Sequence, residues 1–399
     1  MKAVILAAGE GKRLRPFTDT MPKVMLPIAN KPILAHVIDA VKDAGIHDII
    51  VIVGYKKERI MEYFADNTES QLTLIEQSKQ LGTAHALLKA KEAITKTKED
   101  ESFLVLAGDN YIDSESIAMM ISSPETPSIL IKKHKQLSKY GAVTIKDEHV
   151  EQLIEKPKKE ISPFVSTGIY KFNASIFSTI EQQIQEGSYT LSDTIQLLIK
   201  QGIKIRTFQA NLWLDAVYPW DLIELNETII PSIPTMTNGI IEKNVTIKGP
   251  VFIGKNTRIS SGTYIIGPVI IGENCEIGPY SCIFPSTSIG DNSIIKAFSY
   301  IENSILMEET RIGPQSTIYH SIISRGTTTG NHFSTFAGTA IIPTETHIHH
   351  LQQIGAMIGE DCTFQNGIII DPGIIIGGDC TIRSMKHITK NIPSNTNVM

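Results

Sequence analysis

Apolar residues follow two different patterns along this chain, and the first occupies residues 1–228. Short runs of apolar and β-branched residues at 4–6, 49–53 and 103–106 are typical of buried parallel strands. Between the first two runs, residues 33–41 have helical spacing. The alternation of strands and helices predicts a doubly wound, Rossmann-like α/β domain, whose ligands bind beyond the carboxyl ends of the strands.

The second pattern, in residues 240–399, has a period of six. Isoleucine stands at every sixth position from Ile241 to Ile301, and glycine often follows it. The register shifts near Met307 and the period resumes at Ile358. A triangular parallel β-helix has this period, because each coil has three flat faces and each face turns one aliphatic side chain inward. We therefore predict a left-handed parallel β-helix of hexapeptide repeats.

Two irregular segments mark the limits of these domains. Residues 229–239 are rich in proline and glycine and are predicted to form the linker. Residues from about 327 to 353 interrupt the period of six and are predicted to leave the coils as an arm. For the histidines of this arm, His347, His349 and His350, we expect a solvated position, with metal binding as the alternative.

The composition excludes several other classes of protein. The net charge is -5, charged residues make up 20% of the chain, and no block of like charges indicates a nucleic-acid or membrane surface. No apolar segment is long enough to cross a membrane, and the N-terminus lacks the organisation of a signal peptide. The four cysteines form no CxxC pair, so we expect reduced thiols in a cytoplasmic protein.

The first apolar run leads into a turn of small residues that suits phosphate binding. Ala7, Ala8, Gly9 and Gly11 let backbone N–H groups approach phosphate oxygens closely. The turn is not a P-loop, because no GK[ST] follows, and Leu14 replaces the third glycine of a dinucleotide fingerprint.

This turn begins a series of motifs that resembles the signature of sugar-nucleotide pyrophosphorylases. The series reads LAAG at 6–9, GKRL at 11–14, PK at 22–23 and KP at 31–32. The resemblance implies two catalytic residues: Arg13 supports the departing pyrophosphate and Lys23 binds the reacting phosphates. It assigns nucleotide phosphate binding to Leu6, Ala8, Gly9 and Gly11.

The sequence QLGTA at 80–84 resembles the segment of this family that reads the nucleobase. The Gln80 amide can donate to and accept from the imide edge of a pyrimidine, which favours UTP or dTTP. The resemblance also assigns Gly82 and Thr83 to nucleotide binding.

Two aspartates follow or end strand-like runs where ligands are expected. Asp109 comes after the run 103–106, and Asp215 ends the sequence WLD. Mg²⁺ is commonly held by one or two carboxylates, with phosphate oxygens and waters completing its octahedron. The resemblance assigns both aspartates to this metal.

Further segments match the sugar-binding parts of the family. The resemblance assigns sugar-phosphate binding to Gly141, Glu155, Lys156 and Thr167. The sequence LSD at 191–193 resembles a further segment in which threonine normally replaces the serine.

These residues imply a mechanism without a histidine or cysteine nucleophile. A sugar-phosphate oxygen attacks the α-phosphorus of a nucleoside triphosphate in line, and pyrophosphate leaves on the opposite side. The attacking phosphate is already an anion, so catalysis rests on positioning and charge neutralisation.

The whole arrangement resembles enzymes that join an N-acetylglucosamine-1-phosphate uridyltransferase to a glucosamine-1-phosphate acetyltransferase. The second activity uses acetyl-CoA and requires a base, normally a histidine of the β-helix. Pro314 or Gln315 falls near the position of that histidine, which leaves His320 and His332 as tentative bases. The resemblance also implies a homo-oligomer, a trimer or a dimer of trimers.

Two alternatives remain open at this point. One changes the substrates to those of a glucose-1-phosphate thymidylyltransferase or a mannose-1-phosphate guanylyltransferase with a structural β-helix. The other is a non-catalytic regulatory subunit, since the same architecture occurs in such proteins. Arg13, Lys23, Asp109 and Asp215 together favour catalysis.

Overall fold

A computed structural model describes the chain except for residues 66–70, 97–100, 135–138, 156, 158–160 and 345–347. The described residues form two compact units. The first contains Met1–Glu10, Pro22–Met25 and Ile33–Asp215, and the second contains Gly11–Met21, Leu26–Pro32 and Ala216–Met399.

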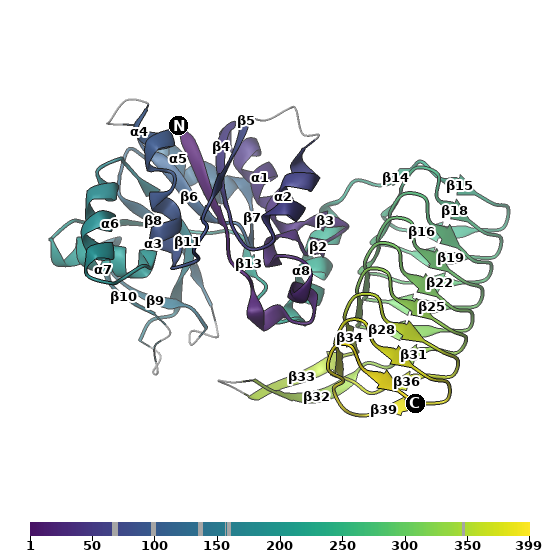
Figure 1. The fold of residues 1–399 in the computed structure, drawn as a ribbon. Coiled ribbons are helices and arrows are strands. Elements are labelled where there is room, and N and C mark those ends of the chain that lie inside the picture. Colours follow the sequence, from purple (N-terminus) through teal and green to yellow (C-terminus); the bar gives the residue numbers. More distant parts are fainter. Residues whose placement is uncertain (66–70, 97–100, 135–138, 156, 158–160, 345–347) are drawn as a thin grey trace. The chain divides into compact units, whose positions relative to one another are not determined.

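The first unit is built on a nine-stranded sheet with the order β5-β4-β1-β6-β11-β8-β12-β10-β9. The three predicted strands lie side by side and parallel at β4 (Asp48–Val53), β1 (Lys2–Ala7) and β6 (Phe103–Ala107). Their residues are almost completely buried, as expected for strands covered on both faces. The doubly wound α/β prediction is confirmed (Figure 1).

The first unit also contains strands and helices, most of which the sequence analysis did not specify. The strands are β5 (Gln71–Glu76), β8 (Ser128–Lys133), β9 (Gly141–Lys146), β10 (His149–Glu155), β11 (Phe164–Phe172) and β12 (Arg206–Gln209). The helices are α1 (Ile33–Asp43), α2 (Lys57–Phe64), α3 (Thr83–Leu88), α4 (Lys91–Thr95), α5 (Ser114–Ser122), α6 (Ile176–Gln185) and α7 (Leu191–Lys200). Strand β11 is antiparallel to β6, so the sheet is mixed.

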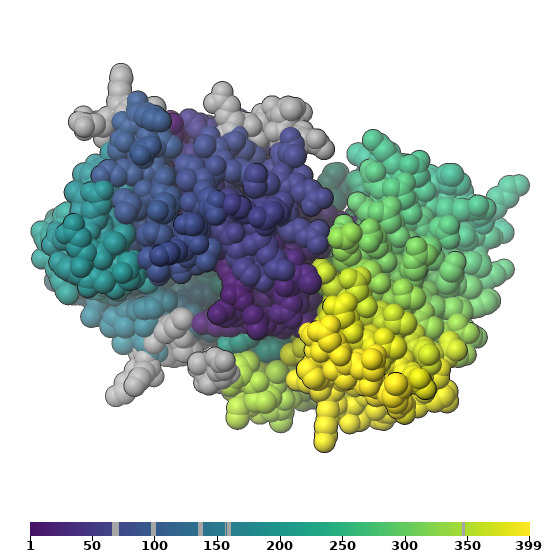
Figure 2. All heavy atoms as spheres, in the orientation of Figure 1, coloured from purple at the N-terminus to yellow at the C-terminus, as the bar shows by residue number. Residues whose placement is uncertain are grey.

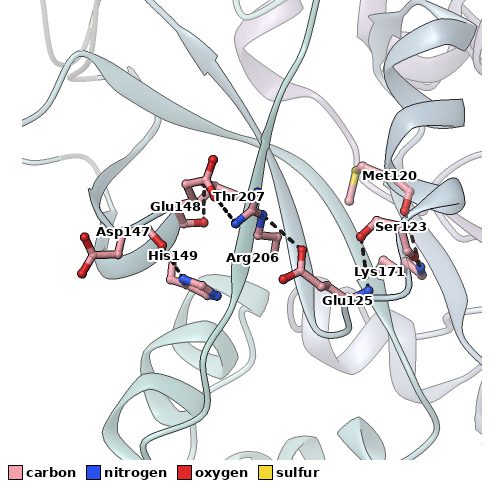
Figure 3. Close-up of polar contacts among 9 residues, drawn as sticks. All are labelled: Met120, Ser123, Glu125, Asp147, Glu148, His149, Lys171, Arg206 and Thr207. Atoms are coloured by element: carbon pink, nitrogen blue, oxygen red, sulfur yellow. Dashed lines mark hydrogen bonds and ion pairs between the residues drawn. The ribbon is translucent and has the colours of Figure 1, made fainter.

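Two positively charged side chains in this unit serve its structure. Lys171 is buried, and its Nζ donates to the carbonyl oxygens of Met120 and Ser123 at the end of α5 (Figure 3). Burial lowers the pKa of Lys171. Arg206 pairs with Glu125 and Glu148, which joins β12 to two neighbouring loops. These contacts within the protein account for the charged groups of Lys171 and Arg206, so neither side chain indicates a ligand site.

Two short strands of the first unit form a separate sheet. Strand β7 (Asn110–Ile112) pairs antiparallel with β13 (Trp213–Asp215), and Asn110 lies opposite Asp215. This pairing brings the chain just after β6 next to the chain at Asp215.

The second unit contains the β-helix, whose parallel strands form sheets of eight, nine and eight strands (Figure 1). These sheets run from β14 (Met236–Thr237) to β37 (Ile375–Ile376), from β15 (Ile240–Ile241) to β40 (Asn397–Val398) and from β16 (Thr246–Lys248) to β39 (His387–Ile388). The isoleucines of the period fill its core, and from Ile253 to Ile301 they are completely buried. The left-handed β-helix prediction is confirmed.

The register shift near Met307 comes from shorter corners. Ile271 pairs with Ile289 in the next coil, eighteen positions later. Ile289 pairs with Leu306, only seventeen positions later. The corner between β25 (Tyr300–Glu302) and β26 (Ile305–Leu306) has therefore lost one residue.

The arm begins later than the sequence predicts. It is an antiparallel hairpin of β32 (Gly338–Pro343) and β33 (Ile348–Ile354). The preceding strands β30 (Thr328–Thr329) and β31 (Ser334–Thr335) still belong to the coils. The difference arises because Thr329 and Thr335 take the buried positions that isoleucine occupies in other coils.

The predicted linker also contains regular structure. The short 3-10 helix η5 (Ile230–Ser232) and β14 lie within it, whereas helix α8 (Asp221–Ile229) ends at its first residue and belongs to the second unit. Asn226 of α8 donates through Nδ2 to the carbonyl oxygen of Ser286 at 2.9 Å, which fixes the helix to a β-helix coil.

The expected solvated position is wrong for one histidine of the arm. His350 is exposed, but the His349 ring packs at 4.4 Å from the ring centroid of Tyr218. His347 lies outside the described residues.

The last coils form a continuous outer surface in the space-filling view, in yellow (Figure 2). In the described part of the chain, no helix is both long and apolar enough to span a membrane.

Candidate active site

The structure brings together three predicted site residues that are far apart in the sequence. Lys23 opens the 3-10 helix η3 (Lys23–Met25), Asp109 follows β6, and Asp215 ends β13. Lys23 Nζ lies 2.6 Å from Asp109 Oδ2 and 2.9 Å from Asp215 Oδ1. One ammonium group therefore bridges both carboxylates.

Burial strengthens the electrostatic coupling of this trio. The side chains of Lys23 and Asp215 are only 12% and 14% exposed. Burial by itself lowers the pKa of Lys23, but the charges of Asp109 and Asp215 outweigh it and raise that pKa above its ordinary value. Burial raises the pKa of Asp215, while Lys23 acts in the opposite direction. Lys23 is therefore a stable ammonium ion at neutral pH.

The two carboxylates fit the predicted Mg²⁺ site. Their contacts with one Nζ atom show that Asp109 and Asp215 face the same point, where a cation is already stabilised. Two carboxylates suffice for Mg²⁺ when phosphate oxygens and waters complete its coordination. Across the described ranges, no group of three or more His, Cys, Asp or Glu side chains is arranged to hold a metal ion.

The first part of the small-residue turn lies at the end of β1. The carbonyl oxygen of Leu6 accepts from Gly108 N at 2.9 Å, and that of Ala8 accepts from Tyr55 N at 3.1 Å. A Cβ atom added to Gly9 would meet no atom within 4 Å, so the space above this exposed residue is open. The turn therefore has room for a phosphate group.

The second part of the turn belongs to the other compact unit. Gly11 has a φ of 76°, a left-handed conformation that favours glycine. It precedes the 3-10 helix η1 (Lys12–Leu14), in which Arg13 is exposed. The role of Arg13 at the pyrophosphate stays a prediction.

Gln77, just before the predicted base-reading segment, is a glutamine that the sequence reasoning missed. Gln80 is exposed, and its Nε2 donates to the carbonyl oxygen of Gln77 at 3.2 Å. Gln77 is 2% exposed, and its Nε2 lies 2.8 Å from His85 Nδ1. Its position could have been noticed, because Gln77 directly follows β5, at the carboxyl end of this strand.

The start of α3 is fixed by close backbone contacts. A side chain at Gly82 would collide with the carbonyl oxygen of Tyr189, which accepts from Ala84 N at 2.8 Å. Thr83 Oγ1 accepts from Leu191 N at 2.8 Å. Only glycine fits at position 82, so the segment 80–84 is held against the start of α7.

The predicted sugar-binding residues are partly brought together. Gly141 and Glu155 are paired across β9 and β10, and Ser192 Oγ donates to Glu155 Oε2 at 2.9 Å. Thr167 is buried, and its Oγ1 donates to the carbonyl oxygen of Leu130 at 2.7 Å. The Thr167 hydroxyl thus stabilises the sheet. Lys156 lies outside the described residues.

The two tentative acetyltransferase histidines lie at different corners of the β-helix. His320 follows β28 (Thr317–Tyr319), and its Nδ1 is 3.2 Å from Asn303 Nδ2. His332 lies between β30 and β31 and is exposed. Burial lowers the pKa of His320, with Glu302 and Glu227 acting in the opposite direction. The two side chains therefore belong to separate local environments.

Comparisons with known proteins agree with both parts of the chain. The nucleotidyl transferase family model matches residues 2–231, and the model of the GMPPB C-terminal domain matches residues 265–376. The bifunctional protein GlmU of Methanocaldococcus jannaschii is 36% identical over 409 residues, covering 99% of this chain and 97% of the relative.

Two further matches cover the first part of the chain. The UTP–glucose-1-phosphate uridylyltransferase AglF of Haloferax volcanii is 35% identical over 239 residues, covering 57% of this chain and 96% of AglF. A solved structure from Bacillus anthracis, assigned as a glucose-1-phosphate thymidylyltransferase, has a TM-score of 0.52 and 25% identity. That match covers 57% of this chain and 94% of the solved one.

Proposed function

The chain belongs to the nucleotidyl transferase family and, over nearly its whole length, to the GlmU family, and from this premise we propose that it transfers a uridylyl group from UTP to N-acetylglucosamine 1-phosphate. The products are a nucleotide-sugar and pyrophosphate. The observation that supports this reaction best is the Lys23 ammonium between Asp109 and Asp215. A regulatory subunit without turnover would have no need of this buried arrangement.

The charged groups of this site suit an in-line phosphoryl reaction. Asp109 and Asp215 would hold Mg²⁺, which neutralises charge on the triphosphate when bound. Lys23 stays positively charged because of both carboxylates, so it can bind the α-phosphate as negative charge grows there. The attacking phosphate is already an anion, so no side chain has to remove a proton.

The other groups would orient the two substrates. Backbone N–H groups near Gly9 and the Arg13 guanidinium would bind the departing pyrophosphate. The Gln80 amide would pair with the uracil edge. Glu155, held by Ser192, would accept hydrogen bonds from sugar hydroxyls, while Lys156 would bind the sugar's phosphate.

A matrix of nucleotides and sugar phosphates tests this assignment. We expect UTP with N-acetylglucosamine 1-phosphate to give the highest kcat/KM, about tenfold or more above dTTP or glucose 1-phosphate. Pyrophosphate release measures each pair, and Asp109→Asn serves as the inactive control. Highest activity with GTP and mannose 1-phosphate would contradict the substrate assignment, and no release from any pair would favour the regulatory alternative.

A second activity is supported by the full-length match to a relative named as bifunctional. We propose acetyl transfer from acetyl-CoA to the amine of glucosamine 1-phosphate, with His320 as the base. Because burial lowers its pKa, the His320 ring is neutral at pH 7. Rotation of the Asn303 amide would place its oxygen against Nδ1–H and leave the lone pair of Nε2 for the amine.

A thiol-release assay with both substrates tests this second activity. We expect His320→Gln to lower the rate about 100-fold. His332→Gln, at a different corner of the coils, should keep it. Acetyl transfer by the wild type is refuted if no thiol is released while uridylyl transfer proceeds.

A further inference from the structure

The hairpin arm has one covered face and one exposed face. Ala340 and Ile342 are 8% and 5% exposed, whereas Ile341 and Ile348 are 62% and 65% exposed. His349 lies opposite Ile342 in the hairpin and shares its covered face. The arm is therefore seated on other residues of the second unit through the face that carries His349.

His349 contacts a pair of stacked aromatic rings. Its ring centroid is 4.4 Å from that of Tyr218 and 5.1 Å from that of Trp220. The Tyr218 and Trp220 rings stack on each other at 4.9 Å and 13°. Both aromatic residues are buried, at 5% and 9% exposure. This geometry lets one side chain of the arm restrain both rings.

The aromatic pair belongs to a short segment that directly follows Asp215. The N–H groups of Val217 and Tyr218 both donate to Asp221 Oδ2 at 2.8 Å, which folds residues 217–221 into one turn. Ala216, between this turn and Asp215, is completely buried. One buried residue therefore joins this turn to Asp215 along the chain.

The β-helix holds this segment at a second point through α8. Asn226 Nδ2 donates to the Ser286 carbonyl oxygen, and Ser288 Oγ donates to Asn226 Oδ1 at 3.1 Å. The turn therefore has a fixed end at α8 and a second restraint at His349. Only the second restraint comes from the arm.

We propose that His349 is a positioning residue for nucleotidyl transfer: by packing on Tyr218 and Trp220, it fixes the chain that carries Asp215. The proposal rests on the proposed function, in which Asp215 holds Mg²⁺. A misplaced carboxylate binds the cation less well even when the chain remains folded. The arm of the β-helix then contributes to the reaction through the chain that follows Asp215.

This role is tested by comparing wild type, His349→Ala and His349→Phe in two measurements. The first measurement is the Mg²⁺ dependence of pyrophosphate release. In His349→Ala, the Mg²⁺ concentration for half-maximal pyrophosphate release should rise roughly three- to tenfold. The KM for the sugar phosphate should stay within about twofold, since that change acts on the metal only. Phenylalanine keeps a ring at this position and should restore most of the Mg²⁺ dependence.

Tryptophan fluorescence gives a second readout, independent of turnover. The chain has two tryptophans, and both flank Asp215, at Trp213 and Trp220. His349→Ala should shift the emission to longer wavelength and increase acrylamide quenching, because Trp220 loses a covering ring. Ile348→Ser, a neighbouring substitution on the exposed face of the hairpin, is the matched control and should change neither property.

The outcomes separate this inference from the proposed function. A wild type without pyrophosphate release refutes the proposed function. An active wild type with an unchanged Mg²⁺ dependence in His349→Ala refutes the positioning role. A lower kcat at unchanged Mg²⁺ dependence, or an equal loss in His349→Phe, also refutes it, because either result shows a general structural effect.

Discussion

Lys23→Met should lower kcat for pyrophosphate release by about 1,000-fold, because the group that we propose stabilises charge on the α-phosphate is lost. The Mg²⁺ concentration for half-maximal activity should not rise. In the free enzyme the Lys23 ammonium occupies the point that both carboxylates face, so removing it leaves Asp109 and Asp215 free for the cation. Steady-state kinetics at several Mg²⁺ concentrations measure both quantities.

Lys91→Met is the matched control for this experiment. Lys91 pairs with Glu181 at the surface of the same unit, and its side chain is 40% exposed. The control should keep its activity, since exposed ion pairs contribute little to stability. A Lys23→Met enzyme with near-normal kcat would contradict the catalytic role of the ammonium.

The pKa of Lys23 also has a consequence for pH dependence. Its folded-state pKa is raised above the unfolded value, so the stability from its ion pairs is fully present below the ordinary lysine pKa. That stability is lost only as pH rises through the folded-state pKa. Lys23 therefore remains charged throughout the neutral range.

The sequence predicted best those features that repeat or are local. The period of six predicted the β-helix, because every inward position of a coil imposes the same demand for an aliphatic side chain. The apolar runs predicted β1, β4 and β6, since strands covered on both faces contain few polar residues. The motif order also named all three members of the trio Lys23, Asp109 and Asp215.

The sequence could not predict contacts that depend on tertiary packing. Lys23 and Asp215 are 192 positions apart, and nothing local indicates that their side chains touch. The arm was placed too early because Thr329 and Thr335, which fill inward positions, are not aliphatic. His349 reads as a solvated histidine in the pattern HIHH, whereas its aromatic partners come from a distant segment.

Asp215→Asn should raise the Mg²⁺ concentration for half-maximal activity about tenfold or more and lower kcat/KM by about 100- to 1,000-fold. The amide keeps the size of the side chain and can still accept from Lys23, so the fold should persist. What is lost is one of the two negative charges that we propose bind the cation. Asp147→Asn, at an exposed loop position, is the control and should change neither value.

Combining Asp215→Asn with His349→Ala tests whether the arm acts through this carboxylate. Independent residues have additive effects, whereas residues that act on one property through one group do not. If His349 positions Asp215, the double variant should need no more Mg²⁺ than Asp215→Asn alone, because no carboxylate is left to position. Additive increases would place the effect of His349 elsewhere, while the loss of activity in Asp215→Asn would still support this residue as a metal ligand.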